Sequence, residues 1–476
     1  MKIFLFIIVF FISITSFSQE IVYELKLNLT ENTDVFQVVE EDKKQVTLFF
    51  SDKNKVKAVR LNESFQVIDS LSTASPSKDF RSIVGYSLTS NKYYSYWSSA
   101  KKKEIIYQCF DFETKQITSK SFKIEFEKEK IIEIITVNNI FYLVTCVKNS
   151  SILNFYVFKD GNLDKKSIDL TDKKFLSSET KPKVLWDIFD ESTAFESSFF
   201  VQDISNESPP SLTLSANKRK VYSQGNSLIF SLDLNSKFTQ LLNINLNNFS
   251  ADLKSYNQPF IEENSYMVAE SNSFLSNDKL IQMKLTWEKM IISIKNLDGT
   301  EFKKFEVLTD QEISFKNSDI IQENGSIKNT RILDNSSKLL RKIQGQNSSL
   351  SCYTSKGKNY VTIGSVSLIQ QNGVLLGGML GGFTGAMIAS SISYNNIFNN
   401  LNSYSGRKVV FINCLFDENF NHLEGNVDKL AFDKLRFFAE NGNKLTSPTI
   451  FKMNSSLVFA AYNKKLANYF FYKFID

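Results

Sequence analysis

Short segments of alternating apolar and polar residues recur along nearly the whole chain. Representative runs are Gln45–Phe50, Ile105–Phe110, Ile140–Thr145 and Ser227–Leu232, which are rich in Val, Ile, Phe, Tyr and Thr. A period of two with β-branched and aromatic enrichment is typical of half-buried strands. No comparably long stretch shows a clean period of 3.6. The sequence therefore predicts an all-β protein.

Pairs of these segments form successive hairpins joined by short polar turns. Asp160-Gly161 and Asp298-Gly299 are turn pairs that favour two-residue hairpin loops. Successive hairpins lie roughly 40 to 60 residues apart, which is typical of four-stranded propeller blades rather than of an immunoglobulin-like sandwich of about 100 residues. The units defined in this way are 31–75, 80–125, 130–175, 190–250, 253–310, 322–426 and 430–476. We predict a single β-propeller domain, 19–476, of about seven four-stranded blades, with six or eight as alternatives.

The two ends of the chain are predicted to share one blade. The last unit is expected to hold the strands Lys434–Glu440, Thr449–Met453, Ser456–Tyr462 and Ala467–Ile475, after which the chain stops. A spare strand, Ile21–Leu27, lies near the N-terminus. Adding it to the last blade closes the ring without leaving an open sheet edge, so we expect this pairing.

This organisation resembles the broad group of secreted β-propellers. The resemblance is one of architecture only, because no Trp-Asp pair repeats from unit to unit and neither a kelch-type Gly-Gly pair nor a sialidase Asp-box recurs. The tryptophans Trp97, Trp186 and Trp287 are not periodic either. No family's site residues can therefore be carried over, and propellers in general host unrelated functions.

The N-terminal segment, 1–18, has the pattern of a secretory signal peptide. Lys2 precedes the apolar run Ile3–Ile14, and small residues follow at Ser16 and Ser18. The run is too short for a permanent membrane anchor. We expect cleavage after Ser18 and an exported protein, whether periplasmic, on the outer surface or secreted.

Charge and cysteine content narrow the choice of partners. The formal net charge is only +5, and no basic block is interleaved with aromatic residues, so we expect no nucleic acid partner.

The four cysteines, Cys109, Cys146, Cys352 and Cys414, lack close metal-ligand spacing. Cys352 and Cys414 fall in one predicted blade and are the better candidates for a disulfide. The alternative is that all four are small buried hydrophobic residues.

Candidate catalytic groups are few. The single histidine, His422, excludes a multi-histidine metal site and leaves a solvated hairpin residue as the simpler interpretation. Carboxylate clusters that might form a glycosidase-like pair are Asp187, Asp190 and Glu191, and Asp417 with Glu418. Adjacent acids in polar loops are usually only solvated. We therefore predict no catalytic, cofactor-binding or metal-binding residues and no cofactor.

One segment is unusual, because no charged side chain occurs from Asn359 to Gly406. Within the apolar insertion at about 369–405, glycines recur every four residues, a spacing that on a helix creates a groove for a second helix. A single membrane span is excluded, because predicted strands of one blade flank the insertion. The alternatives for 373–392 are an extension of the blade, a contact surface, or a re-entrant membrane segment; 394–405 is expected to be a flexible return loop. The proposed contact residues are Gly373, Leu376, Gly377, Leu380, Gly381, Phe383 and Gly385.

These observations favour a non-catalytic binding or scaffold protein of the cell envelope, with another protein or an envelope component as its partner and 373–392 as the preferred contact. The alternative is a carbohydrate-active enzyme. It requires two or three carboxylates and an aromatic side chain converging at the mouth of the central channel. Membrane association through 373–392 ranks third.

Overall fold

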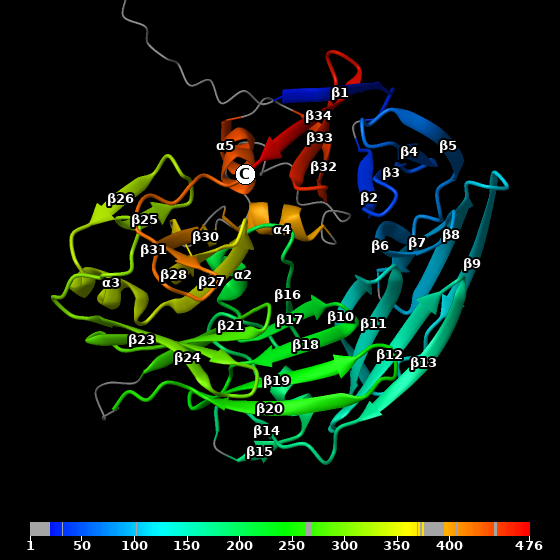
Figure 1. Ribbon diagram of the computed structural model, residues 1–476. Helices are drawn as coiled ribbons and strands as arrows, with labels where there is room; N and C mark the ends of the chain where they lie inside the picture. Colours follow the sequence, from blue (N-terminus) through cyan, green and yellow to red (C-terminus); the bar gives the residue numbers. More distant parts are fainter. Residues whose placement is uncertain are drawn as a thin grey trace, which may run out of the picture.

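The chain folds into seven main β-sheets that follow one another in a ring (Figure 1). The computed structural model describes residues 20–30, 32–100, 102–179, 181–262, 269–368, 370–371, 374–375, 395–404, 407–441 and 445–476. Within these residues, five of the main sheets have four strands and two have five. The prediction of an all-β propeller with about seven blades is confirmed.

The first three sheets are antiparallel meanders, and their predicted boundaries hold closely. Their strands are β2 (Asp34–Glu40), β3 (Gln45–Ser51), β4 (Lys55–Leu61), β5 (Val67–Ala74), β6 (Phe80–Thr89), β7 (Lys92–Ser99), β8 (Glu104–Asp111), β9 (Gln116–Lys123), β10 (Glu129–Val137), β11 (Ile140–Val147), β12 (Ile152–Lys159) and β13 (Asn162–Asp169). The predicted two-residue turn Asp160-Gly161 joins β12 to β13, with φ of 51° and 71°. Positive φ at both positions is what a type I′ hairpin turn requires.

The fourth and fifth sheets follow after a connection that carries two short strands and a helix. The connection holds β14 (Phe175–Leu176), β15 (Pro182–Lys183) and α1 (Leu185–Asp190). The fourth sheet holds β16 (Gln202–Ile204), β17 (Arg219–Gln224), β18 (Ser227–Leu232), β19 (Phe238–Asn245) and β20 (Ala251–Asn257), with α2 (Leu212–Ser215) between β16 and β17. The fifth holds β21 (Glu270–Ser276), β22 (Lys279–Leu285), β23 (Lys289–Asn296) and β24 (Glu301–Leu308). The predicted break at 250–253 is wrong, because β20 pairs with β19 and belongs to the fourth sheet.

The sixth sheet is built out of chain order. Its elements are β25 (Ile320–Asn324), β26 (Thr330–Leu333), α3 (Ser336–Ile343), β27 (Asn347–Ser355), β28 (Lys358–Leu368) and β31 (Arg407–Asp417). The spatial order is β26-β25-β31-β28-β27, so the strand that precedes the insertion and the strand that follows it are neighbours. Within the insertion, β29 (Gln370–Gln371) pairs with β30 (Val374–Leu375). The proposed contact residues Gly373, Leu376, Gly377, Leu380, Gly381, Phe383 and Gly385 lie outside the described residues.

The seventh sheet contains both ends of the described chain. It holds β32 (Thr446–Met453), β33 (Ser456–Asn463), β34 (Asn468–Ile475) and β1 (Glu20–Lys26), and β1 runs antiparallel to β34. The predicted strand Lys434–Glu440 is wrong, because these residues lie in the helix α5 (Ala431–Asn441). Phe432, Leu435 and Ala439 are buried at intervals of three and four residues, which places them on one face of a helix.

The predicted flexible return loop is also wrong, because it contains the helix α4 (Asn396–Ser403). The side chain of Asn395 caps the helix by accepting a hydrogen bond from the backbone N–H of Phe398. Ile397, Phe398 and Leu401 are buried against α5 and the seventh sheet. Two helices thus pack beside the last blade, and no helix among the described residues is long and apolar enough to cross a bilayer.

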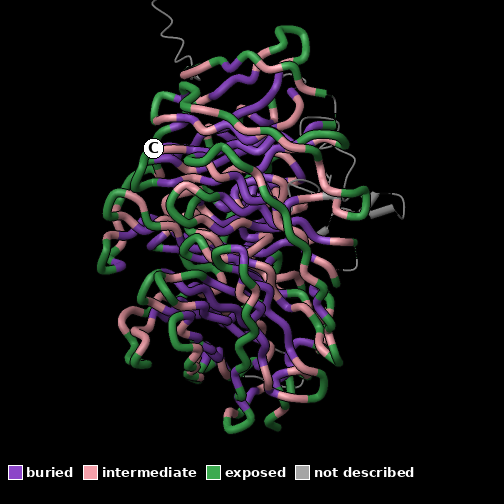
Figure 2. The backbone as a smooth tube through the Cα atoms, turned by 90° about the vertical axis from the view of Figure 1, so that its right-hand side faces the viewer, coloured by how far each residue is buried: buried purple, intermediate pink, exposed green. Residues whose placement is uncertain are grey.

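Burial follows position within each blade. Middle strands such as β3, β7 and β11 are almost wholly buried, whereas the outer strands β5, β9 and β13 are largely exposed. Figure 2 shows the buried stretches running through the interior, with exposed stretches at edges and loop tips. The outer strands β9 and β13 carry several lysines and other polar residues, which discourage pairing with another chain.

The disulfide between Cys352 and Cys414 that the sequence left open as one alternative does not form. Cys352 on β27 and Cys414 on β31 both lie opposite Val361 of the intervening strand β28. Two strand spacings separate their Cα atoms by roughly 9 to 10 Å, beyond the limit of about 7 Å for a disulfide. Cys109, Cys146, Cys352 and Cys414 are all free and buried, which confirms the alternative that they act as small hydrophobic residues.

Candidate functional site

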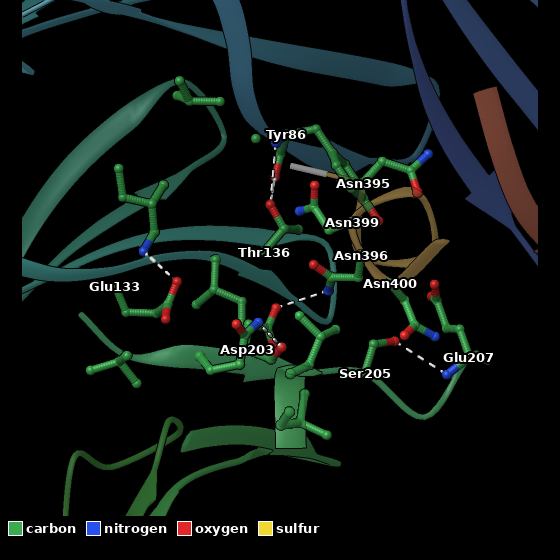
Figure 3. Close-up of a pocket in the computed structure, with 18 of the residues that line it drawn as sticks. Tyr86, Glu133, Thr136, Asp203, Ser205, Glu207, Asn395, Asn396, Asn399 and Asn400 are labelled. Atoms are coloured by element: carbon green, nitrogen blue, oxygen red, sulfur yellow. Dashed lines mark hydrogen bonds between the residues drawn. The ribbon is translucent and has the colours of Figure 1, made fainter. Parts of the chain in front are cut away.

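The central channel opens into a cavity of about 950 Å³. Its walls come from the inner strands of several blades and from two helices, namely β2, β6, β10, β16, β32, α2 and α4, with the loop that follows β16. Side chains far apart in the sequence therefore meet here, as in the close-up of Figure 3. Much of the wall is apolar, with Phe36, Ile132 and Phe451 among the lining residues.

Four acidic residues line this cavity, and three of them come from two neighbouring blades, whereas the fourth, Glu41, follows β2. Glu133 lies on β10 at a point where the pairing with β11 shifts register between Ile131 and Glu133. Such a bulge re-aims the side chains of a strand. Asp203 lies on β16, which pairs parallel to β17 as an additional inner strand of the fourth sheet. Glu207 follows on the loop after β16. In Figure 3, Asp203 lies between Glu133 and Asn396 of α4.

The three carboxylates have few partners. Oδ2 of Asp203 accepts a hydrogen bond of 2.8 Å from Nδ2 of Asn396, and Oε1 of Glu133 accepts one of 2.9 Å from the backbone N–H of Ile134. Within the part of the chain that the structure describes, none of the three forms an ion pair. Lys102 and Lys452 also line the cavity, but neither ammonium group is within salt-bridge distance of these acids.

The surroundings raise the pKa of each acid. Burial, and then the charge of Asp203, raise the pKa of Glu133 well above its ordinary value, although Lys102 acts in the opposite sense. Burial raises the pKa of Asp203 to about 6. Burial and the charge of Asp203 also raise the pKa of Glu207. Because Glu133 and Asp203 interact, the protonation of one acid affects the pKa of the other.

The asparagines of α4 divide into two groups. Asn395 donates to the backbone oxygen of Ile450 at 2.8 Å and caps the helix, and Asn400 donates to Ser208 and Pro209 while accepting from Ser211. Both hold α4 in place and have little capacity left for a ligand. Asn396 instead points to Asp203 and orients its carboxylate.

Tyr86 is a further polar residue in this wall. The backbone N–H and C=O of Tyr86 are hydrogen-bonded to the hydroxyl of Thr136, which fixes the position of β6 beside β10. The phenolic hydroxyl of Tyr86 has no hydrogen bond to any described residue, and burial raises its pKa above the ordinary value. The hydroxyl is thus a neutral donor and acceptor available to a ligand.

The acidic clusters singled out in the sequence lie elsewhere. Asp187 and Asp190 are exposed on α1, and Glu191 follows them; none lines the cavity. Asp417 accepts hydrogen bonds from the backbone N–H groups of Asn419 and Asn421, which form a turn. The side chain of Asn421 and these backbone bonds hold the pKa of Asp417 below its ordinary value.

Two further candidates, Glu418 and His422, lie in the same part of the chain as Asp417. Glu418 is exposed in the turn that follows β31. Nε2 of His422 lies 3.1 Å from Oδ1 of Asn317, and the His422 ring packs edge-on to Phe416. Neither reaches the cavity. Among the described residues, no group of three or more His, Cys, Asp or Glu side chains could hold a metal ion.

Known proteins offer little further guidance. No protein-family model matches the chain, and no curated protein matches it. Among solved structures, a protein from Lactobacillus plantarum is similar at 10% identity and a TM-score of 0.27, covering 72% of this chain and 86% of that one. The WD40 domain of SCAP from fission yeast is similar at 11% identity and a TM-score of 0.31, covering 95% and 98%. Cobalt-substituted Synechocystis ACO is similar at 8% identity and a TM-score of 0.28, covering 60% and 62%. At these TM-scores the likenesses carry no argument about function, so the assignment of a propeller rests on the sheets themselves.

Proposed function

We propose that this chain is an exported, non-catalytic binding protein that holds a hydroxyl-rich component of the cell envelope in the central cavity. The convergence of Glu133, Asp203 and Glu207 with Tyr86 carries the proposal. A volume of about 950 Å³ suits a ligand of a few sugar rings. Carboxylate, carboxamide and phenol groups are the hydrogen-bonding partners that hydroxyl groups require.

The edge of the cavity supports the same class of ligand. Phe199 and Phe200 lie on the lining segment just before β16, and Phe200 is 42% exposed. An exposed aromatic ring beside polar groups offers an apolar face for the C–H side of a sugar ring. The segment 373–392 stays the proposed contact with a protein partner or the membrane.

A binding measurement tests this proposal. Mature protein, 19–476, is titrated calorimetrically with soluble oligosaccharides released from cell envelopes. Asp203→Ala is expected to weaken binding about tenfold or more, because it removes an oriented acceptor from the cavity. The matched control is Asp187→Ala, which lies outside the cavity. The proposal fails if no oligosaccharide binds, or if the control weakens binding as much as Asp203→Ala does.

A carbohydrate-active enzyme is the second candidate, and the raised pKa values of Glu133 and Asp203 favour it. Glycoside hydrolysis needs one acid that keeps its proton near neutral pH and a second that is ionised. The measurement is release of new reducing ends from the same oligosaccharides between pH 4 and pH 8. Turnover that falls more than about a hundredfold in Glu133→Gln supports an enzyme. Binding without turnover supports the binding protein.

A further inference from the structure

We infer that the ligand of the central cavity carries a protonated amine in addition to hydroxyl groups, and that Glu133, Asp203 and Glu207 receive the ammonium group. The ligand class is an amino sugar whose amine is free rather than acetylated. This inference rests on the proposed function, which it deepens by adding charge to the ligand.

The charge around the cavity is unbalanced. The carboxylates in the lining are Glu41, Glu133, Asp203 and Glu207, and the ammonium groups are Lys102 and Lys452. Acids therefore outnumber bases in the wall. A neutral ligand leaves that excess uncompensated, and an anionic ligand adds like-charge repulsion. A cationic ligand complements it.

Other buried acids of this protein show what complete pairing looks like. Asp233 lies 3.0 Å from the ammonium of Lys220, and Glu196 lies 3.1 Å from the guanidinium of Arg219, with all four side chains at most 1% exposed. Removing a carboxylate from water is costly unless such a partner is present. The cavity acids are only partly shielded from water and face open space instead of a cation, and an ammonium group of a ligand would lie in that space.

The neutral hydroxyl of Tyr86 indicates the chemistry of the rest of the ligand. The Tyr86 hydroxyl lines the cavity and has no hydrogen-bond partner among the described residues. This group can donate to or accept from a hydroxyl, but it gives no charge compensation to an ammonium. The cavity thus offers carboxylates for a positive charge and an uncharged site for hydroxyl groups, the combination that an amino sugar presents.

Calorimetric titration of the mature protein at pH 7, above the pKa of Asp203, tests the inference with three probes. These are the trimer of glucosamine, its fully N-acetylated counterpart and trilysine. Charge-assisted hydrogen bonds predict that the free amine binds about 10- to 100-fold more tightly than the acetylated trimer. Asp203→Asn and Glu133→Gln keep the size of each side chain and are each expected to remove most of that preference. Asp187→Asn, outside the cavity, is expected to retain it.

The outcomes separate this inference from the proposed function. Equal affinity for both sugars, or a preference for the acetylated trimer, overturns the inference that the ligand carries a free amine. The proposed binding of a saccharide in the cavity would then still stand. Absence of binding by either sugar overturns the proposed function together with the inference. Tighter binding of trilysine than of the glucosamine trimer overturns the claim that the ligand is a sugar, and indicates that the cavity binds a basic peptide. A cooperative unfolding transition in each variant shows that loss of affinity does not come from loss of the fold.

Discussion

Two groups of acids in this molecule, one fully buried and one lining the cavity, have opposite surroundings. Between the fourth and fifth sheets, Asp233 contacts Lys220 at 3.0 Å and accepts hydrogen bonds of 2.7 Å from both Thr239 and Ser273. Although burial opposes its ionisation, Lys220 and these hydroxyls hold the pKa of Asp233 below the ordinary value. In the central cavity, burial raises the pKa of Asp203 to about 6, because only Asn396 assists its charged form.

The difference separates structural acids from candidate ligand-binding acids. The group around Asp233 crosses a boundary between blades, since Nζ of Lys220 also donates to Asn272 of the fifth sheet. Its members satisfy one another and leave no space. The cavity acids are incompletely satisfied and face about 950 Å³ of open volume. Incomplete satisfaction beside a cavity is a stronger indication of a site than burial alone.

The largest expected effect comes from breaking the paired group. Lys220→Met is expected to lower the free energy of unfolding by about 3 to 5 kcal/mol, because it leaves Asp233 buried without its cation. Urea unfolding monitored by circular dichroism measures the change. Lys159→Met, at an exposed position on β12, is the control. Adding Asp233→Leu to Lys220→Met is expected to recover part of the loss. A loss below about 1 kcal/mol in the single variant would contradict the role given to this pair.

Removing charge from the cavity is expected to act in the opposite direction. Asp203→Asn is expected to raise the free energy of unfolding by about 1 to 2 kcal/mol at pH 8, because a carboxylate with a raised pKa is less favourable in the folded state than in the unfolded chain. The same urea titration measures it, with Asp187→Asn as the control. Destabilisation by Asp203→Asn at pH 8 would mean that the ligand-free protein gains stability from this charge. That result would contradict the claim that the Asp203 carboxylate is incompletely satisfied.

The pH dependence of the free energy of unfolding distinguishes Asp203 from Asp233. The pKa of Asp203 rises from 3.8 to about 6 on folding, so its contribution to stability is complete below about pH 4 and is lost as pH rises through 6. The advantage of Asp203→Asn over the wild type is therefore expected to vanish at pH 4 and to reach its full size by pH 8. Asp233 behaves oppositely, since its contribution is lost only as pH falls below 3.8. An advantage that is independent of pH would rule out the titration of Asp203 as its cause.

The smallest effect on stability is expected from Glu207. Although the surrounding protein raises the pKa of Glu207, its side chain keeps contact with solvent, so water screens much of its charge. Glu207→Gln is expected to change the free energy of unfolding by less than about 0.5 kcal/mol while still weakening the binding of the glucosamine trimer. A stability change as large as that of Asp203→Asn would place Glu207 among the incompletely solvated acids.

The blades could be predicted from the sequence because strand periodicity is local, as the match of the first three units to their sheets shows. The helix α4 was missed because four of its eight residues are asparagine, which has low helix propensity, and its stability comes from Ile397, Phe398 and Leu401 packing on α5 and the seventh sheet. Tertiary packing of this kind leaves only a short apolar pattern in the sequence.

The cavity acids were missed for a different reason. Glu133 and Asp203 are 70 positions apart and meet only because the inner strands of successive blades converge. Glu133 sits between Ile132 and Ile134, whereas Asp203 sits between Gln202 and Ile204. An acid between two apolar residues of a strand was thus a signal for Glu133 only. The clusters of adjacent acids named as candidates lie instead on α1 and in the turn after β31.

The pairing of β1 with β34 bears on the order in which the molecule is made. One edge strand of the seventh sheet, β1, is the first described strand, and its neighbour β34 is the last described strand. This sheet, and the apolar cluster that joins it to the first blade through Val46, Phe451 and Phe471, cannot form until both β1 and β34 are available. Contacts between residues so distant in the chain form slowly, because the loop must close before it is stabilised. Formation of the seventh sheet is therefore expected to be a late step of folding, because it needs the two ends of the described chain to meet.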